Sequence, residues 1–143
     1  LITNHSTTLI LLENDGTGNF TDITAGSGLE IANFFLQAKM VDFDNDGFVD
    51  LVYAGGSEGF LHNNGDQTFT WMDDVFPYVG DQLHSFAIGD LNHDGQMDLY
   101  GSYGGGYVNP DYNHDDALWL NDGNSNNWIT FQLEGTMSNV NAI

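Results

Sequence analysis

The sequence predicts an all-β fold built from a repeated unit of short antiparallel strands, and three observations lead to this prediction. Glycine is abundant (18 residues), proline is scarce (2), and Asn and Asp crowd the gaps between short apolar runs, as is typical of strands joined by tight turns. Two acidic loops, 42–50 and 90–98, repeat one pattern of acids and glycine. Asn/Asp-Gly turn signals occur at Gly16 and at Gly65, and the spacing between these two glycines is almost the same as the spacing between the two acidic loops. Because two independent markers share almost the same period, one structural unit is expected to repeat.

Three similar stretches each predict a β-hairpin. Each has a short apolar run, then Asn or Asp before Gly, then an aromatic residue, and the Asn/Asp-Gly pair supplies the positive φ angles of a tight turn. The stretches are LLENDGTGNF (11–20), LHNNGDQTF (61–69) and LWLNDGNSNNW (118–128). The insertion GSYGGGYVNPDYNHDD (101–116) lengthens the spacing between the second and the third hairpin.

Strand signals also flank both acidic loops. They are FFLQAKMV (34–41) and VDLVYAG (49–55) around the first loop, and LHSFAIG (83–89) and MDLYGSY (97–103) around the second. One repeat is therefore strand, acidic loop, strand, turn, strand, hairpin turn, strand. Four strands in a period of roughly 50 residues is the pattern of a β-propeller blade. We expect two to three blades, each a four-stranded antiparallel sheet, as part of a larger propeller; a β-sandwich with coincidental similarity is the alternative.

Length, composition and charge narrow the class of protein. The 143 residues suffice for one domain with a core, and 41 % apolar and 13 % aromatic residues predict a folded chain. Twenty-one acids against a single base, Lys39, give a net charge of −20, which disfavours nucleic acid and anionic membranes and attracts cations. The chain has no cysteine, no apolar run long enough to span a membrane and no signal peptide, so we expect it to be the interior of a longer protein.

The two acidic loops carry the chemistry of a calcium site. Side-chain oxygens occupy positions 1, 3, 5 and 9 of each loop, a glycine (Gly47, Gly95) occupies position 6, and a backbone carbonyl at position 7 can point inward. The predicted ligands are Asp42, Asp44, Asp46, Phe48 (carbonyl) and Asp50 in the first loop, and Asp90, Asn92, Asp94, Gln96 (carbonyl) and Asp98 in the second. Zinc would require His or Cys, and neither occupies a predicted ligand position. Two structural Ca²⁺ sites are therefore expected, each with a Kd of roughly 0.1–1 mM.

Two alternatives compete with this interpretation of the loops. An EF-hand needs flanking helices and a Glu at position 12, where this chain has Tyr53 and Gly101. An Asp-rich turn capped by its own backbone hydrogen bonds would need no metal. The recurrence of the whole pattern in register favours metal binding over the capped turn.

Other chemistry-bearing residues give weaker signals. His84, beside Ser85, alternates with apolar residues as an ordinary strand residue does, and His93 lies at position 4 of the second loop, so no catalytic group is expected. In the insertion, Asp111, Asn113 and Asp115 resemble half a calcium loop, which leaves a third cation site open. Three tyrosines there, Tyr103, Tyr107 and Tyr112, could offer a surface for sugar or protein, or belong to a solvated loop.

The stretches VDFDNDGFVDLVYAGG and GDLNHDGQMDLYGS resemble the calcium loops of FG-GAP (VCBS-type) repeats, which build the propeller of integrin α-chains and of many exported bacterial proteins. LLENDGTGNFTDIT resembles the blade-closing hairpin of these repeats, and NNWITFQLEGTMSNVNAI (126–143) is similar to the opening of the ASPIC/UnbV domain, although Val140 stands where that motif usually has Arg. The resemblance implies FG-GAP-like repeats over 1–122. Over 123–143 it implies the last strand region and the beginning of an ASPIC/UnbV-like segment.

The resemblance also implies a function. We expect a calcium-binding, non-enzymatic module of an extracellular, periplasmic or cell-surface protein that binds another protein or mediates adhesion. The alternatives are a lectin-like carbohydrate-binding module and an accessory segment of a secreted polysaccharide-processing enzyme. Exposed strand edges of an incomplete propeller predict self-association.

Overall fold

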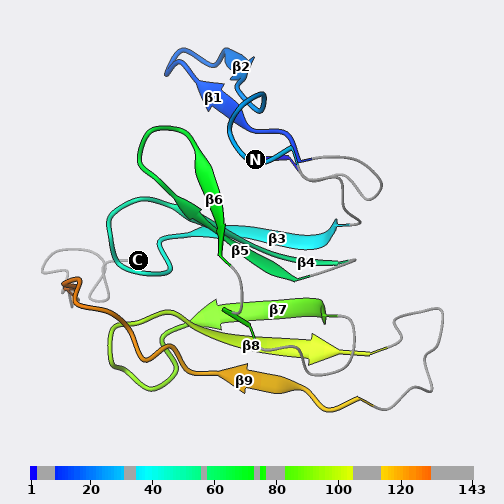
Figure 1. Cartoon of the computed structure of the whole chain (residues 1–143), viewed down its shortest axis with the longest axis vertical. Coiled ribbons are helices and arrows are strands. Elements are labelled where there is room, and N and C mark those ends of the chain that lie inside the picture. Colours follow the sequence, from blue (N-terminus) through cyan, green and yellow to red (C-terminus); the bar gives the residue numbers. More distant parts are fainter. Residues whose placement is uncertain are drawn as a thin grey trace, which may run out of the picture.

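The computed structural model describes residues 1–2, 9–30, 35–55, 58–72, 75–76, 83–104 and 114–129. Within these ranges the chain forms nine antiparallel strands and no helix (Figure 1). None of the described residues belongs to a long apolar helix of the kind that crosses a membrane. The strands are β1 (Leu12–Asn14), β2 (Phe20–Asp22), β3 (Phe35–Val41), β4 (Asp50–Gly55), β5 (Gly59–Asn63), β6 (Phe69–Met72), β7 (Leu83–Gly89), β8 (Asp98–Tyr103) and β9 (Ala117–Trp119).

The strands form three sheets whose order follows the chain. The first sheet is the hairpin β1-β2, the second is the four-stranded blade β3-β4-β5-β6, and the third is β7-β8-β9. The sheets stay open rather than closing on themselves, and β7 lies beside β3 and β4 (Figure 1). This arrangement confirms the all-β prediction with propeller-like blades, and the four strand signals that flank the acidic loops correspond to β3, β4, β7 and β8.

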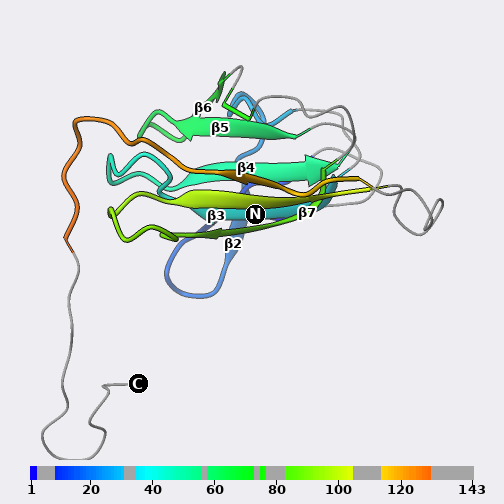
Figure 2. The same cartoon turned by 90° about the horizontal axis from the view of Figure 1, so that it is seen from below.

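The middle sheet is covered on both faces. Every residue of β4 is buried, because successive side chains of a strand point to opposite faces and both faces have a neighbour. Leu51 and Tyr53 pack in one core cluster, whereas Val52 and Ala54 pack in another. Figure 2 shows β4 between β5 on one side and β3 on the other.

The two core clusters join neighbouring sheets. The first cluster brings Leu9, Leu11 and Leu29 from the N-terminal segment onto β4 and β5 of the middle blade. The second joins the middle blade to the third sheet through Phe43, Phe60, Phe86, Leu99 and Tyr103, among others. Packing between successive sheets, more than packing within one sheet, therefore makes up the hydrophobic core.

The hairpin turns differ in detail from the prediction. Gly16 and Gly65 have positive φ angles (81° and 79°), as the Asn/Asp-Gly signal requires, but the residue before each glycine does not. The second positive φ comes two positions later, at Gly18 (97°) and Gln67 (70°), so the turns are longer than the predicted tight turn. Of the third predicted hairpin, 118–128, the structure shows the first strand, β9, and no second strand in the described residues up to 129.

Candidate metal-binding loops

Both acidic loops lie at the same end of neighbouring sheets. Residues 42–49 connect β3 to β4 and residues 90–97 connect β7 to β8, as the sequence predicts (Figure 1). The strand pairs on either side have the same register, because Val41 pairs with Asp50 in one sheet and Gly89 pairs with Asp98 in the other. The first and the ninth residue of each loop are therefore held close together by the strand ladder.

The backbone of each loop wraps around the carboxylate at position 1. In the first loop the N–H groups of Asp46 and Gly47 donate to the two oxygens of Asp42, both at 3.1 Å. In the second loop the corresponding N–H groups, of Asp94 and Gly95, donate to Asp90 at 3.1 and 3.0 Å. Amides that converge on one carboxylate hold the chain in a tight ring with its acidic side chains crowded together.

The two loops also share their unusual backbone conformations. Gly47 and Gly95, at position 6, have φ angles of 93° and 85°, which confirms the predicted pivot. Position 4 has a positive φ as well, 58° at Asn45 and 64° at His93. Asn and His are among the residues that tolerate this left-handed conformation best, so the local sequence agrees with the loop geometry.

The aspartates at position 9 are buried structural residues. The side chains of Asp50 and Asp98 have no exposed surface. Asp50 Oδ2 accepts the N–H of Phe43 (2.9 Å), and Asp98 Oδ2 accepts the corresponding N–H, of Leu91 (2.8 Å). These contacts close each loop from its ninth residue back to its second. Since each carboxylate oxygen has two lone pairs, a metal could still bind on the other side.

The other oxygen of each buried aspartate ties the loop to the end of the third strand of its sheet. The N–H of Asn63 donates to Asp50 Oδ1 (2.8 Å), and the N–H of Asn121 donates to Asp98 Oδ1 (2.9 Å). The amide side chains return the contact, because Asn63 Nδ2 donates to the carbonyl of Val49 (2.9 Å). Sequence reasoning assigned no site role to these asparagines, although both begin the recurrent Asn-x-Gly turn, which was the available signal.

The first loop gathers its carboxylates closely enough to share a cation. One oxygen each of Asp42, Asp44 and Asp50 lies within 4.8 Å of the others. Burial raises the pKa of Asp44, and the charge of Asp46 raises it further, while His62 partly offsets both. Burial likewise raises the pKa of Asp50, against the lowering effect of its two backbone hydrogen bonds. Raised pKa values mean that the ionised carboxylates lack sufficient compensating charge, which a bound cation would supply.

The second loop reproduces the backbone geometry with a different charge distribution. Asn92 takes the place of the third-position acid and donates to Asp94 Oδ2 (2.8 Å). Among the described residues, the acids of this loop form no group of three as tight as that in the first loop. The carbonyl oxygens of Phe48 and Gln96 remain predicted ligands. All ten predicted ligand residues thus lie in two loops of one design, of which the first is the more concentrated in charge.

A histidine from a neighbouring strand reaches into the first loop. His62, on β5, places Nδ1 3.3 Å from Asp44 Oδ2 and 3.4 Å from Asp50 Oδ1, and Nε2 3.8 Å from Asp46 Oδ2. His62 was not among the residues predicted for the site. His62 lies outside the loop in sequence, and only the pairing of β4 with β5 brings its side chain beside Asp50.

The loops also contact each other and the C-terminal segment. Asn45 Nδ2 donates to the carbonyl of Gly95 (3.0 Å) and to Gln96 Oε1 (2.9 Å). Residues 120–129 run past both loops (Figure 1), and Asn124 and Asn126 donate to the carbonyl of Asp44. The two sites are therefore mechanically connected through amide side chains.

The remaining candidate residues do not assemble a site. His84 is partly buried and Ser85 is exposed on the same strand, where neighbours face opposite sides. Tyr103 is only 6 % exposed and packs against Trp119 at a centroid distance of 5.9 Å, so its proposed place on a binding surface is wrong. Asp111, Asn113, Tyr107 and Tyr112 lie outside the described residues, and Asp115 is exposed.

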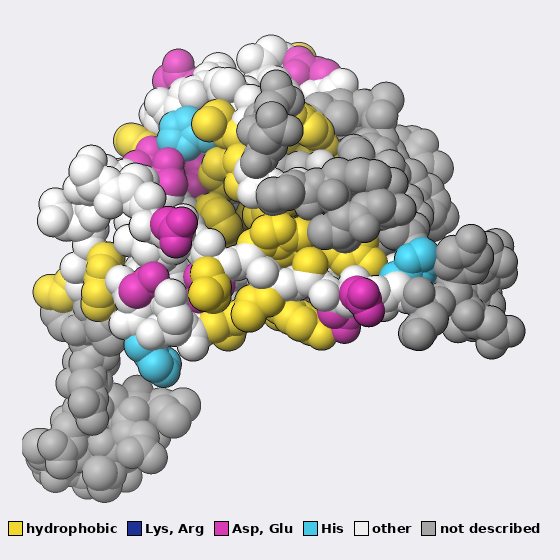
Figure 3. Space-filling view, turned by 60° about the horizontal axis from the view of Figure 1, so that its bottom comes forward, with side chains coloured by type: hydrophobic (Ala, Val, Ile, Leu, Met, Phe, Trp, Pro, Cys, Tyr) yellow, Lys and Arg dark blue, Asp and Glu magenta, His cyan; other side chains and the backbone are white. Residues whose placement is uncertain are grey.

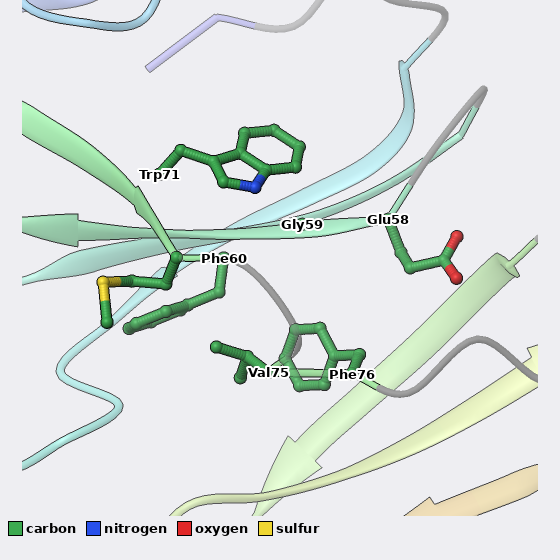
Figure 4. A pocket seen from close by; sticks show the side chains of 7 residues that line it. Glu58, Gly59, Phe60, Trp71, Val75 and Phe76 are labelled. Carbon is green, nitrogen blue, oxygen red and sulfur yellow. The ribbon is translucent and has the colours of Figure 1, made fainter.

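A hollow next to the middle blade is too small for a sugar. It measures about 120 Å³ and is lined by Glu58, Phe60, Trp71, Val75 and Phe76, among others. Figure 4 shows Phe60, Val75 and Phe76 gathered below the strands, with the Glu58 carboxylate at one side. Ligand pockets usually measure at least roughly 300 Å³, so this hollow is smaller than a usual ligand pocket.

Carboxylates are spread over the surface without basic partners. On the face drawn in Figure 3, carboxylates and histidines lie on both sides of a band of hydrophobic side chains that runs through the middle, and no Lys or Arg is in view. With a single base in the whole sequence, the carboxylates of the loops have no basic side chain to neutralise them other than histidine.

Comparison with known proteins finds a family match for the central part of the chain. Residues 42–101 match the family described as FG-GAP-like repeat. No curated protein matches the chain. The matched region begins at the first residue of the first acidic loop and includes the whole of the second loop. It ends before residues 126–143, so the likeness of that segment to an ASPIC/UnbV domain stays a prediction. Residues 42–101 are therefore similar to an FG-GAP-like repeat, a kind of repeat that suggests an integrin-like β-propeller module.

Proposed function

We propose that this chain is a calcium-stabilised, non-enzymatic β-propeller module in which each acidic loop holds one Ca²⁺. The proposal depends mainly on the first loop. There, one oxygen each of Asp42, Asp44 and Asp50 lies within 4.8 Å of the others, and the pKa values of Asp44 and Asp50 are raised. The recurrence of the same backbone ring in the loop 90–98 supports a second site.

The donor set fits calcium. Each loop offers oxygen atoms from side chains and a backbone carbonyl, and calcium accepts six to eight oxygens in flexible geometry. The ligands would come from Asp42, Asp44, Asp46, Asp50 and the Phe48 carbonyl in the first loop, and from Asp90, Asn92, Asp94, Asp98 and the Gln96 carbonyl in the second. A bound ion would supply the positive charge that the carboxylates lack and would link the two strands on either side of the loop.

We further propose that the module belongs to an exported protein and serves extracellular protein binding or adhesion. The FG-GAP-type repeat supports this role, since such repeats occur in extracellular proteins. A carbohydrate-binding role has less support, because Tyr103, one of the tyrosines expected on a binding surface, is buried. Self-association remains part of the proposal, supported by the exposed Leu118 and Leu120 at and just beyond β9.

The test is thermal unfolding during a calcium titration, with EDTA as the reference state. At a tenfold excess over Kd, each site adds about 1.4 kcal/mol, so two sites add about 2.8 kcal/mol. For a chain of this length that corresponds to a rise in Tm of roughly 10 °C. The double variant Asp46→Ala, Asp94→Ala should lose most of this rise, and magnesium should give less of it than calcium.

Two outcomes would refute the proposal. One is an unchanged Tm of the wild-type protein at a saturating calcium concentration. The other is an equal calcium response in the double variant, which would place the binding outside the loops. Matched variants outside the loops, Asp22→Ala and Asp66→Ala, control for the general removal of acidic charge, and they should keep the full response.

A further inference from the structure

A side chain of the first acidic loop reaches into the backbone of the second. Asn45, at position 4 of the first loop, donates its Nδ2 to the carbonyl of Gly95 (3.0 Å) and to Gln96 Oε1 (2.9 Å). Gly95 is the pivot of the second loop, and Gln96 offers the carbonyl that is predicted to bind the ion there. One amide of the first loop therefore holds the peptide segment that carries a ligand of the second.

Gln96 has little freedom to move away from this contact. It is only 7 % exposed, although it lies in a loop. Its side chain lies against Gly123, where an added Cβ atom would come within 2.8 Å of it. On the other side, the Trp128 ring lies so close to Gly95 that it leaves no room for a Cβ atom. Because tightly packed groups transmit a displacement instead of absorbing it, a change at Asn45 reaches the backbone at Gln96.

A second contact joins the bases of the two loops. Asn121 Nδ2 donates to the carbonyl of Phe43 (3.1 Å), at position 2 of the first loop, and to the carbonyl of Met97 (3.3 Å), at position 8 of the second. The backbone N–H of Asn121 donates to the buried Asp98 (2.9 Å). Asn63, the equivalent residue of the middle blade, donates its Nδ2 to the carbonyl at position 8 of its own loop (2.9 Å). The bond to Phe43 is thus an additional one, and it connects the two loops.

Ordering of the first loop should also order part of the second. Asn45 lies between Asp44 and Asp46, two predicted ligands, and has a φ angle of 58° in the left-handed region. When calcium fixes the carboxylates on both sides, the residue between them loses its freedom of motion. The Asn45 amide then keeps Gly95 and Gln96 in place, so the second loop orders at a smaller entropic cost. A first ligand that lowers the ordering cost for a second produces positive cooperativity.

We propose that the two loops bind calcium with positive cooperativity and that the Asn45 amide is the main link between them. The coupling rests on the proposed function, because it requires a calcium site in each loop. Coupling between two sites is reciprocal and typically changes affinity by about 5- to 150-fold, so at least about fivefold is expected here. Repulsion between the two cations opposes the coupling, but water and salt screen it where the loops are partly exposed.

The experiment is a calcium titration of the whole chain in which each loop is observed separately by nuclear magnetic resonance. The backbone amides of Gly47 and Gly95 report on one loop each, because each donates to the first aspartate of its own loop (3.1 and 3.0 Å). Asp46→Ala removes a ligand of the first loop only. In this variant, the Gly95 signal should respond at a calcium concentration at least about fivefold higher than in the wild-type chain.

Asn45→Gly tests the link itself. Glycine adopts the same positive φ angle without strain, so the variant keeps the loop backbone and loses the amide. With Asn45→Gly already present, the addition of Asp46→Ala should change the Gly95 response by less than about twofold, because the coupling is gone. The matched control is His93→Gly, at position 4 of the second loop, where φ is 64°. No hydrogen bond from His93 to the first loop is found among the described residues, so this variant should keep the coupling.

Three outcomes would overturn the inference. They are a Gly95 response in Asp46→Ala within about twofold of wild type, a coupling that persists in Asn45→Gly, and a loss of coupling in His93→Gly as complete as in Asn45→Gly. In each of these cases both loops of the wild-type chain still bind calcium, so the proposed function stands. If neither Gly47 nor Gly95 responds to calcium in the wild-type chain, the proposed function and the coupling fail together.

Discussion

Replacing the buried aspartate of the second loop should destabilise the protein even when no metal is present. Asp98 has no exposed surface and accepts the N–H groups of Leu91 (2.8 Å) and Asn121 (2.9 Å). Asp98→Ala removes both bonds and leaves two backbone donors without their acceptor. A hydrogen bond to a charged group contributes about 1.5–3 kcal/mol, so the loss of two should be about 3–6 kcal/mol. Asp98→Asn keeps one acceptor oxygen and should cost about half as much.

The assay is urea unfolding monitored by tryptophan fluorescence, and it is performed once in EDTA and once in saturating calcium. The calcium-free series isolates the hydrogen bonds, because metal ligation contributes nothing there. A loss of about 3 kcal/mol corresponds to a decrease in Tm of roughly 10 °C for a chain of this length. Asp94→Ala is the matched control in the same loop: its side chain is exposed, and its removal in EDTA should cost below about 1 kcal/mol.

Two results would refute this reasoning. If the free energy of unfolding of Asp98→Ala in EDTA lies within about 1 kcal/mol of the wild-type value, the buried carboxylate acts only as a metal ligand. Equal losses for Asp98→Ala and Asp94→Ala would mean that burial and backbone contacts do not distinguish the two acids. If Asp98→Ala does not fold, the loss of stability in Asp98→Asn is compared with that in Asp94→Ala instead, and it decides between the same two conclusions.

Three other predictions concern contacts between sheets and between chains. Tyr103→Phe removes a buried hydroxyl that has no hydrogen-bond partner among the described residues. Thermal melts at neutral pH should therefore show an unchanged stability or a gain of about 1 kcal/mol. A loss above about 1 kcal/mol would contradict this prediction. Burial, with a smaller effect of the Glu58 charge, raises the pKa of Tyr103, so the folded state favours the neutral phenol and stability should fall as the pH rises above about 10. The phenylalanine variant should show a weaker alkaline loss in unfolding experiments, and an identical loss would assign it to other groups. Gln37→Ala breaks two hydrogen bonds to the backbone of Phe86 in the next sheet (2.9 and 2.8 Å). It should lower the free energy of unfolding in urea by about 1–3 kcal/mol, whereas the control Gln67→Ala, at an exposed residue, should lower it by less than about 0.5 kcal/mol. Equal losses would show that the bonds between sheets contribute little to stability. Light scattering should detect concentration-dependent association, and a monomer at all concentrations would refute it.

The sequence predicts the repeated parts of this molecule well, because they depend on local patterns. Alternating acids with a glycine at position 6 predict the loops, and short apolar runs on either side predict β3, β4, β7 and β8. The positive φ angles of Gly47 and Gly95 follow from the same local requirement. Repetition strengthens the prediction beyond what any single segment provides, since an accidental match seldom recurs in register.

Contacts that depend on strand pairing could not be predicted from local sequence patterns. The approach of His62 to Asp44 requires knowledge of which β5 residue lies opposite Asp50, and sequence spacing alone does not give it. Likewise, Asn63 and Asn121 resemble ordinary turn residues until the pairing brings their N–H groups to the buried aspartates. The long insertion 101–116 hides this equivalence, because it lengthens the interval between the corresponding turns.

The burial of β4 on both faces has a consequence for how the molecule unfolds. Leu51 and Tyr53 are coupled to the N-terminal hairpin, while Val52 and Ala54 are coupled to the third sheet, so one strand transmits a loss of packing in both directions. In a linear array, each unit is stabilised by its nearest neighbours as well as by its own contacts. The β4 amides should therefore exchange with deuterium last of all, and a small deletion in the core along this strand should loosen two interfaces at once. The middle blade should therefore set the cooperativity of the array, because both neighbouring parts of the structure pack against it.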